Sequence, residues 1–494
     1  MKMPAIGSEM HDMPIKRRVI HWIRHNFSFF IFGLVCIIWF LFRTGTKPSR
    51  IEYPCQRASI AGANLWVAVF LFPLVSIIKS HENVRTTRLL GAGIIGFVLI
   101  IGALYFFGTG NPESINEDVP QSMVTSDIFV VNGTSGNDGG VAQLLNLMER
   151  KGTPFYAIRN GTSKTGLIAK DDVVLIKVNS QWDERGGTNT DLVKALIQAI
   201  VDHPDGFTGE IIVADNGQAQ NGPTKTGGNL SYIKNNAEDI SQSMTKVVGS
   251  FSGTSNISTY LWDTITTKRV REYAEGDMDD GFIVNETRNP RTGILVSYPK
   301  FRTQYGTYVS FKKGIWHTEK RAYEEDRLKI INVPVLKVHG QMGVTGAVKN
   351  YMGVPSNKLT SRMGGSAHTS VDKGGMGTEM AETRFPTITF LDAIWINARP
   401  GSGPTSHYDI ATQTKIIAAS TDPVALDFWA AQNILMPTAK SLGYTDLSSI
   451  DPENNSRGKF GNWLRLSMGE LRKSGYNTTI DRNAMNVYFT EKNP

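Results

Sequence analysis

Cysteine is almost absent from this chain, which has only Cys36 and Cys55 among its 494 residues. A zinc site of thiolates or an iron–sulfur cluster needs more cysteines than this, and so does a disulfide framework. We therefore expect no iron–sulfur cluster and a fold that is stabilised by its apolar core. The hydrophobic content of 40% is sufficient for a large core.

An excess of positive charge is also absent from most of the chain. Residues 1–110 contain 12 lysines and arginines against 4 aspartates and glutamates, whereas the remaining residues contain 40 against 41. Binding to a phosphate backbone requires a concentrated basic surface. The neutral balance after residue 110 therefore argues against a nucleic-acid partner, although the whole chain has a pI of about 9.1.

Charged residues are missing from three apolar runs, at 27–42, 59–78 and 89–107. Because roughly 20 apolar residues cross a bilayer core, we predict three transmembrane helices within 27–107, with the lipid bilayer as a partner. A cleaved signal peptide is the alternative for the first run. It is disfavoured because no small-residue cleavage site follows this run and two further runs come after it.

The distribution of basic residues predicts an orientation in the membrane. Basic residues precede the first run, whereas residues 108–149 contain none. The positive-inside rule then predicts a multi-pass cell-membrane protein with a cytoplasmic N-terminus at 1–26 and a large C-terminal domain outside the cytoplasm. Four basic residues between the first two runs oppose this orientation, and Asn-x-Ser/Thr sequons beyond the third run agree with it.

Strand-like and helix-like segments alternate after a polar linker at 108–126. Buried strands are expected at 127–131, 172–178, 210–214, 331–339, 385–397, 415–419 and 486–490, and helices at 141–151, 190–203, 423–435 and 457–474. This alternation predicts an α/β fold for 127–494, a three-layer domain with a mainly parallel sheet. Residues 217–325 interrupt the pattern and are expected to form a β-rich insertion.

The stretch 331–350 is predicted to be a buried strand, a glycine-rich turn and a helix of small residues. Three similar segments end other strands, after Lys177, Asp215 and Asn397. The carboxyl ends of parallel strands meet at one edge of a sheet, where ligands bind in open α/β folds. We therefore expect one shared site at this edge.

The residues at these strand ends predict a pocket for a small anionic ligand. Lysines inside apolar strands are costly unless they reach water, a carboxylate or an anion. As catalytic candidates we take Lys177, Asp215, Lys337 and His339, and as substrate-binding candidates Asn179, Asn216, Lys349, Asn350 and Arg399. A divalent metal held by Asp215 and His339 is left open.

A structural role for the same residues is the alternative. Asp215 would then pair with one lysine, His339 would cap a turn, and the glycines would only permit tight connections. Asp422 is expected to cap a helix, with Asp427 as a structural carboxylate of that helix. His368 lies in a flexible glycine-rich loop that is long enough to close over the site.

Several of these motifs together resemble a known family. They are Val-Leu-Ile-Lys177-Val-Asn179, Val-Ala-Asp215-Asn-Gly217, Leu-Lys337-Val-His339, Gly-Ala-Val-Lys349-Asn350, Gly403-Pro404 and Asp422-Pro-Val-Ala-Leu-Asp427. In this order, over about 127–436, the chain resembles domain of unknown function family 362. The resemblance implies an uncharacterised α/β domain, some of whose members carry ferredoxin-type cysteine clusters that this chain lacks.

The sequence leaves three kinds of function open. The first is a membrane-anchored enzyme acting on a small anionic substrate, with or without a divalent metal. The second is an extracytoplasmic ligand-binding or sensory module that communicates through the membrane helices. The third is a structural protein of the cell surface, which would tolerate substitution of the lysines at the strand ends.

Overall fold

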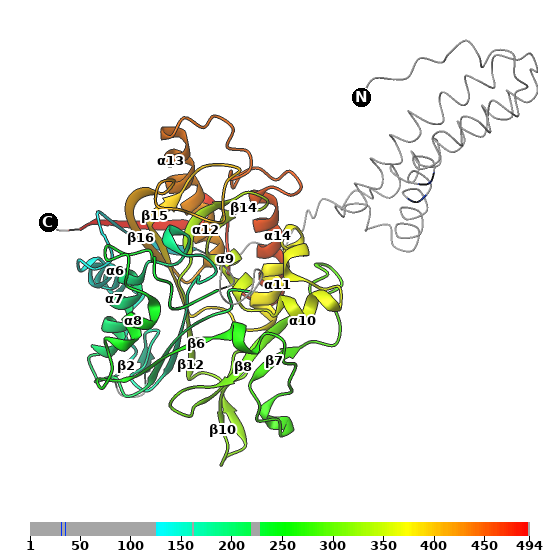
Figure 1. Cartoon of the computed structure of the whole chain (residues 1–494). Coiled ribbons are helices and arrows are strands. Elements are labelled where there is room, and N and C mark those ends of the chain that lie inside the picture. The colour runs from blue at the N-terminus through cyan, green and yellow to red at the C-terminus, as the bar shows by residue number, and fades with distance from the viewer. Residues whose placement is uncertain (1–30, 32–34, 36–124, 161–162, 219–227, 493–494) are drawn as a thin grey trace, which may run out of the picture. The chain divides into compact units, whose positions relative to one another are not determined.

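The computed structural model describes residues 31, 35, 125–160, 163–218 and 228–492 (Figure 1). The chain divides into two compact units, residues 1–120 and 121–494, and the fold below is that of the second unit. The predicted N-terminus at 1–26, all but the last two residues of the predicted linker at 108–126, and nearly all of the predicted membrane region lie outside the described residues. Within the described ranges, no helix has the length and apolar character needed to span a bilayer.

A large, mainly parallel sheet forms the centre of this unit. Its strands are β1 (Ser126–Asn132), β4 (Val173–Lys177), β5 (Glu210–Asp215), β6 (Asn256–Leu261), β12 (Leu328–Asn332), β13 (Val335–His339), β14 (Gly343–Thr345), β15 (Ile388–Asn397), β16 (Thr412–Ser420) and β17 (Met485–Glu491). The order is β17-β1-β16-β15-β12-β4-β5-β6, and β13 pairs with β14 and β15. The predicted α/β class and mainly parallel sheet are confirmed.

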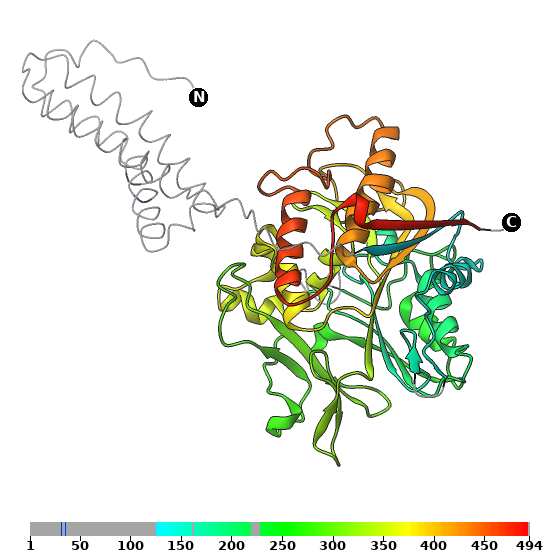
Figure 2. The ribbon, with the colours of Figure 1, turned by 180° about the vertical axis from the view of Figure 1, so that it is seen from behind.

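Helices cover the sheet through two separate apolar clusters. On β1, Phe129 and Val131 pack with α6 (Gly140–Arg150), α7 (Thr190–Val201) and α8 (Met244–Gly249). Ile128 and Val130, which point to the opposite face, belong to the cluster that contains the second group of helices. That group consists of α9 (Ala347–Asn350), α10 (Asn357–Arg362), α11 (Gly375–Glu382), α12 (Pro423–Ala430), α13 (Met436–Ser441) and α14 (Phe460–Lys473). The two groups of helices lie on opposite sides of the main sheet in both views (Figures 1 and 2).

A smaller antiparallel sheet forms the β-rich part of the region predicted as an insertion. It contains β7 (Gly281–Val284), β8 (Ser297–Arg302), β9 (Tyr308–Ser310), β10 (Gly314–His317) and β11 (Ala322–Glu324), in the order β11-β10-β9-β8-β7. The same predicted range, 217–325, also contains α8 and β6, and β6 pairs in parallel with β5 in the main sheet. A two-stranded sheet, β2 (Ile158–Asn160) with β3 (Ser163–Thr165), completes the strands of the described chain.

The stretch 331–350 differs from the prediction in its details. The expected single strand is broken at Val333 and Pro334 into β12 and β13, because proline has no N–H to donate to the sheet. The glycine-rich turn connects β13 to β14, which pair antiparallel, with Lys337 opposite Thr345. The helix α9 begins only at Ala347, after β14.

Candidate functional site

The strands β4, β5, β13 and β15 run in one direction, so their carboxyl ends lie at the same edge of the sheet. A cavity of about 310 Å³ opens at this edge. Its lining residues include eight of the predicted site residues, namely Lys177, Asn179, Asp215, Asn216, Lys337, His339, Lys349 and Asn350. The strand-end argument therefore placed these side chains together correctly, and their chemical roles remain predictions.

Arg399 is the predicted site residue that does not line the cavity. It follows β15 in a turn in which the Asn397 side chain accepts hydrogen bonds from the Arg399 N–H (3.1 Å) and from Ser402 Oγ (3.2 Å). The guanidinium Nε of Arg399 donates to the carbonyl of Ile410 at 3.3 Å. The turn thus directs this side chain to a backbone partner, and the cavity is bordered here by Gly403 and Pro404 instead.

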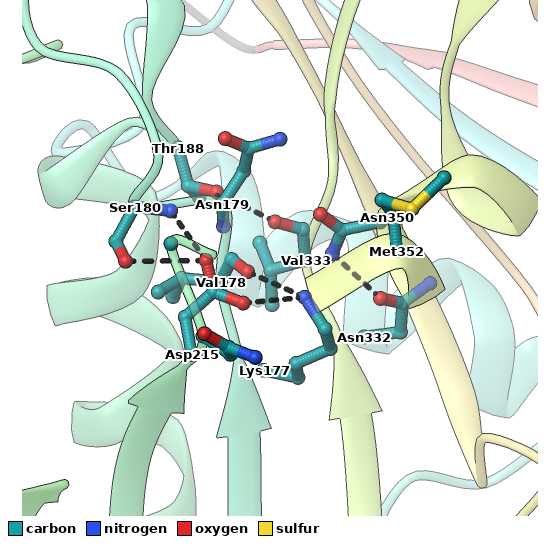
Figure 3. A network of polar contacts seen from close by, with 12 residues as sticks. Lys177, Val178, Asn179, Ser180, Thr188, Asp215, Asn332, Val333, Asn350 and Met352 are labelled. Atoms are coloured by element: carbon teal, nitrogen blue, oxygen red, sulfur yellow. Dashed lines mark hydrogen bonds and ion pairs between the residues drawn. The ribbon is translucent and has the colours of Figure 1, made fainter. Parts of the chain in front are cut away.

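Lys177 and Asp215 form a buried ion pair in the wall of the cavity (Figure 3). Lys177 Nζ lies 2.7 Å from Asp215 Oδ1 and donates to the Val178 carbonyl at 2.9 Å. Asp215 Oδ2 accepts hydrogen bonds from the Ser180 N–H at 2.7 Å and from Ser180 Oγ at 3.1 Å. Burial lowers the pKa of Lys177, and Asp215 opposes this shift. Each side chain of the pair thus has a partner of opposite charge, which is the structural alternative named above for Asp215.

Gly353 allows the chain after α9 to close directly over this ion pair. A Cβ at position 353 would lie 2.3 Å from Asp215 Oδ1 and 2.7 Å from Lys177 Nζ. The Gly353 carbonyl also accepts a hydrogen bond from the Asn216 N–H at 3.2 Å, and Asn216 Nδ2 donates to the Pro355 carbonyl at 2.9 Å. These contacts connect β5 to the segment that follows the helix α9.

Replacing Gly353 with alanine is expected to destabilise the protein by about 1–3 kcal/mol, because the added methyl group must displace the ion pair. The matched control is Gly469→Ala within α14, where a Cβ meets no atom within 4 Å. Alanine in that helix should stabilise the protein by about 0.5–1 kcal/mol. Thermal unfolding of both variants measures the difference, and similar melting temperatures for the two would contradict the close approach at Gly353.

Lys337 and Lys349 are buried at the cavity without a carboxylate partner. Lys337 Nζ donates to the Gly186 carbonyl, and the Lys349 ammonium has no hydrogen-bond or ion-pair partner among the described residues. Burial and the charge of Lys349 lower the pKa of Lys337 well below its usual value. Burial lowers the pKa of Lys349 to about 8. Burial is the main cause of both shifts, and for Lys337 the negative charges of Asp215 and Asp392 offset it only in part.

Two histidines face the same cavity as these lysines. Burial, together with Lys349, Lys337 and His368, lowers the pKa of His339 to about 2. Burial and Lys349 lower the pKa of His368 to about 4. Both imidazoles are therefore neutral at physiological pH. His339 Nδ1 accepts the Met342 N–H at 3.3 Å, which is the turn-capping role named as an alternative.

Two short series of hydrogen bonds hold asparagines close to Lys177 (Figure 3). Asn350 Nδ2 donates to Asn332 Oδ1 at 2.8 Å, and Asn332 Nδ2 donates to the Ala347 carbonyl at 3.0 Å. The Asn179 N–H donates to Thr188 Oγ1 at 2.8 Å, and this hydroxyl donates to the Val333 carbonyl at 2.7 Å. These bonds tie the carboxyl ends of β4 and β12 to each other and to α9.

Asp427 fixes the start of the helix that carries Lys349. Its carboxylate accepts the N–H groups of Ala347 (2.5 Å) and Val348 (2.9 Å). A Cβ on Gly346 would lie 2.1 Å from Asp427 Oδ1, so only glycine permits this approach. Asp422 caps α12, as predicted, by accepting from the N–H groups of Val424 and Ala425. Asp427 is thus a positioning residue for α9 as well as a member of α12.

Within the described residues, Asp215 and His339 belong to no larger cluster of metal-ligating side chains. No group of three or more histidine, cysteine, aspartate or glutamate side chains in the described part of the chain is arranged to hold a metal ion. Both carboxylate oxygens of Asp215 accept hydrogen bonds from Lys177 and Ser180. This environment does not favour a divalent metal at Asp215 and His339.

Some lining residues were not among the predicted site residues. They are Gln181, Trp182, Gln218, Gly340, Gln341, Thr345, Met352, Gly353, His368, Gly403 and Pro404. Several of them are found in the glycine-rich or strand-end segments already singled out. Their position in the sequence therefore pointed to the site, whereas their residue type did not. His368 was noted only as part of a loop.

Comparisons with known proteins support part of the resemblance. Residues 300–432 match the family model described as Domain of unknown function (DUF362). A protein of Synechocystis sp. named as a thylakoid-associated protein is 33% identical over 129 residues, which cover 24% of this chain. The chain spans 39% of the length of that relative. No solved structure matches the chain. The segments around Lys177 and Asp215 lie outside the family match.

Proposed function

We propose that the cavity at the carboxyl edge of the sheet binds a small anionic molecule through Lys337 and Lys349. The observation that carries this proposal is the presence of two buried lysines, on one cavity, without a carboxylate partner. Lys177, in the same wall, has such a partner in Asp215. An anionic ligand would supply the missing negative charge, and a cavity of about 310 Å³ suits a small molecule.

The neutral histidines suit the same ligand. In the protonated state they would add positive charge beside two lysines, whereas as neutral groups they can each donate one hydrogen bond and accept another. Trp182 and Met352 supply an apolar part of the lining. The cavity therefore combines a cationic end with polar and apolar walls, as small-molecule sites commonly do.

The test measures the binding of sulfate, phosphate and small carboxylates to the full-length protein in detergent. We expect Lys349→Met to weaken the binding of the best anion by about 10- to 100-fold, because a charge-assisted hydrogen bond is lost. Isothermal titration calorimetry gives the affinity, and the anion-dependent rise in melting temperature gives an independent measure.

The matched control is Lys440→Met, which removes an exposed lysine on α13. This variant should bind the anion as the parent does, because an exposed charge is screened by solvent. If Lys337→Met and Lys349→Met also bind with the parent's affinity, the cavity is not the anion site.

We also propose that the chain is anchored in a membrane through 27–107, with the domain at 127–494 outside the cytoplasm. The three apolar runs and the basic residues before the first of them support this arrangement. The name of the Synechocystis relative, a thylakoid-associated protein, agrees with membrane association.

The membrane proposal predicts that the protein stays in the membrane fraction after extraction with alkaline carbonate. Protease added to sealed cells or spheroplasts should then degrade the C-terminal domain, with a cytoplasmic protein as the protected control. Release of the chain by carbonate would contradict the anchor, and protection of an anchored chain would contradict the orientation.

A further inference from the structure

We propose that Lys349 is a nucleophile that forms a Schiff base with the carbonyl carbon of a small anionic oxo compound, such as a 2-oxo acid, whose anionic group is held by Lys337. This inference rests on the proposed anion site. It adds a class of ligand, a covalent step and a division of labour between the two lysines.

The environments of the lysines separate their roles. Lys177 is held by Asp215 and the Val178 carbonyl, so its amine is not available. Lys337 donates to the Gly186 carbonyl, which fixes its position in the wall. Lys349 lines the cavity and has no hydrogen-bond or ion-pair partner within the described chain. Its amine is therefore the one of the three that is available to a ligand.

The backbone holds Lys349 close to Lys337. Thr345 of β14 is the register partner of Lys337 on β13, and Lys349 lies four residues after Thr345, in α9. Both lysines line the cavity, and the charge of Lys349 acts on Lys337. The start of α9 is fixed by the two hydrogen bonds to Asp427, and its end by the bond between Asn350 and Asn332. The amine therefore projects from a segment that is anchored at both ends.

A buried amine beside a second cation is suited to carbonyl chemistry. Only the neutral amine is nucleophilic, and desolvation or a neighbouring cation increases its fraction at neutral pH. The pKa of Lys349, lowered to about 8 by burial, is consistent with this requirement. When the anionic group of the ligand lies beside Lys337, it favours the protonated form of that lysine, which keeps the two roles distinct.

The covalent step balances without an oxidant or reductant. The Lys349 Nζ lone pair attacks the carbonyl carbon, the carbonyl π electrons move to oxygen, and a proton passes from nitrogen to oxygen to give a carbinolamine. Loss of water with uptake of one proton from solvent gives the protonated imine. His368 faces the same cavity and can carry protons between the nitrogen, the leaving oxygen and solvent, whereas His339 accepts the Met342 N–H at Nδ1 and stays neutral.

The experiment treats full-length protein in detergent with pyruvate or glyoxylate as the probe and with sodium cyanoborohydride, which reduces the imine to a stable amine. Peptide mass spectrometry then locates the adduct. We expect labelling of Lys349 at least tenfold above that of the exposed Lys440, and protection of Lys349 by excess sulfate. In Lys349→Arg, which keeps the positive charge, the adduct should be lost.

The parent protein alone decides the assignment, so misfolding of a variant cannot obscure it. Sulfate binding is measured on the same sample. If sulfate binds but Lys349 is labelled no more than Lys440, the Schiff base is overturned and the anion site stands. If the main adduct is on Lys337, the assignment of the nucleophile is overturned. If neither sulfate binding nor selective labelling occurs, both proposals fail.

Discussion

Lys177→Met is expected to lower the free energy of unfolding of the C-terminal domain by about 3–5 kcal/mol, because it leaves Asp215 buried without its cation. The lysine and aspartate side chains are 0% and 3% exposed, and Lys177 Nζ lies 2.7 Å from Asp215 Oδ1. Methionine keeps the apolar stem of the lysine and leaves little empty space in the core. The loss of stability therefore reports on the missing charge and not on lost packing. Chemical denaturation followed by tryptophan fluorescence measures the change.

Lys337→Met and Lys349→Met are the matched variants for this measurement. Each removes a buried lysine from the same cavity, but neither leaves a carboxylate unpaired. Both variants should be as stable as the parent or more stable in the absence of anions, because a costly buried ammonium is removed. The double variant Lys177→Met/Asp215→Asn should recover part of the loss. Equal destabilisation by all three single lysine substitutions would contradict the difference between paired and unpaired lysines.

The site was predictable to the extent that it follows from strand direction. Lys177, Asp215 and His339 each end a strand that the apolar pattern identifies, and parallel strands bring their carboxyl ends to one edge. The glycines near these ends then indicate where backbone and side chains approach closely. Gly346 and Gly353, which face Asp427 and the ion pair, are examples.

The division of the lysines into paired and unpaired groups was not predictable from the local sequence. Ile-Lys177-Val-Asn and Leu-Lys337-Val-His look alike, but their neighbours in the sheet differ. Lys177 is the register partner of Ala214 on β5, so Asp215 follows immediately beside it. Lys337 lies opposite Thr345 and Asn397, neither of which carries a negative charge. Strand order, which a single sequence does not specify, decided the electrostatics.

The other differences between prediction and structure have local causes. Pro334 breaks the strand that the apolar pattern predicted to be continuous, and the register with β15 shifts between Val335 and Lys337. The position of Arg399 after β15 predicted a site residue, but hydrogen bonds within its own turn direct it elsewhere. Local turn geometry and a single proline thus outweighed patterns that extend over several residues.

The affinity for sulfate is expected to fall by about 50-fold between pH 8 and pH 10, with a slope that approaches tenfold per pH unit as the pH rises. The proposed ligand binds the protonated form of Lys349, whose pKa is about 8 in the free protein. Sulfate keeps a constant charge over this range, so the decrease reports on the protein. Calorimetric titration at half-unit pH steps measures it, and the decrease should level off above the pKa of the sulfate-bound state.

The stability of the free protein should change in the opposite direction over the same window. The folded-state pKa of Lys349, about 8, lies below the unfolded value of about 10.5, so the unfolded chain binds more protons between these values. The cost of burying the ammonium is fully present below pH 8 and is relieved as the pH rises toward 10.5. Lys349→Met should remove this increase in stability and also the pH dependence of any residual sulfate binding.

A parent protein whose sulfate affinity is constant from pH 7 to pH 10 would exclude a role for the Lys349 charge in binding. Loss of affinity together with an unchanged pH dependence in Lys349→Met would assign the titration to another group. Lys337, which lines the same cavity and is in no ion pair among the described residues, would be the first to replace.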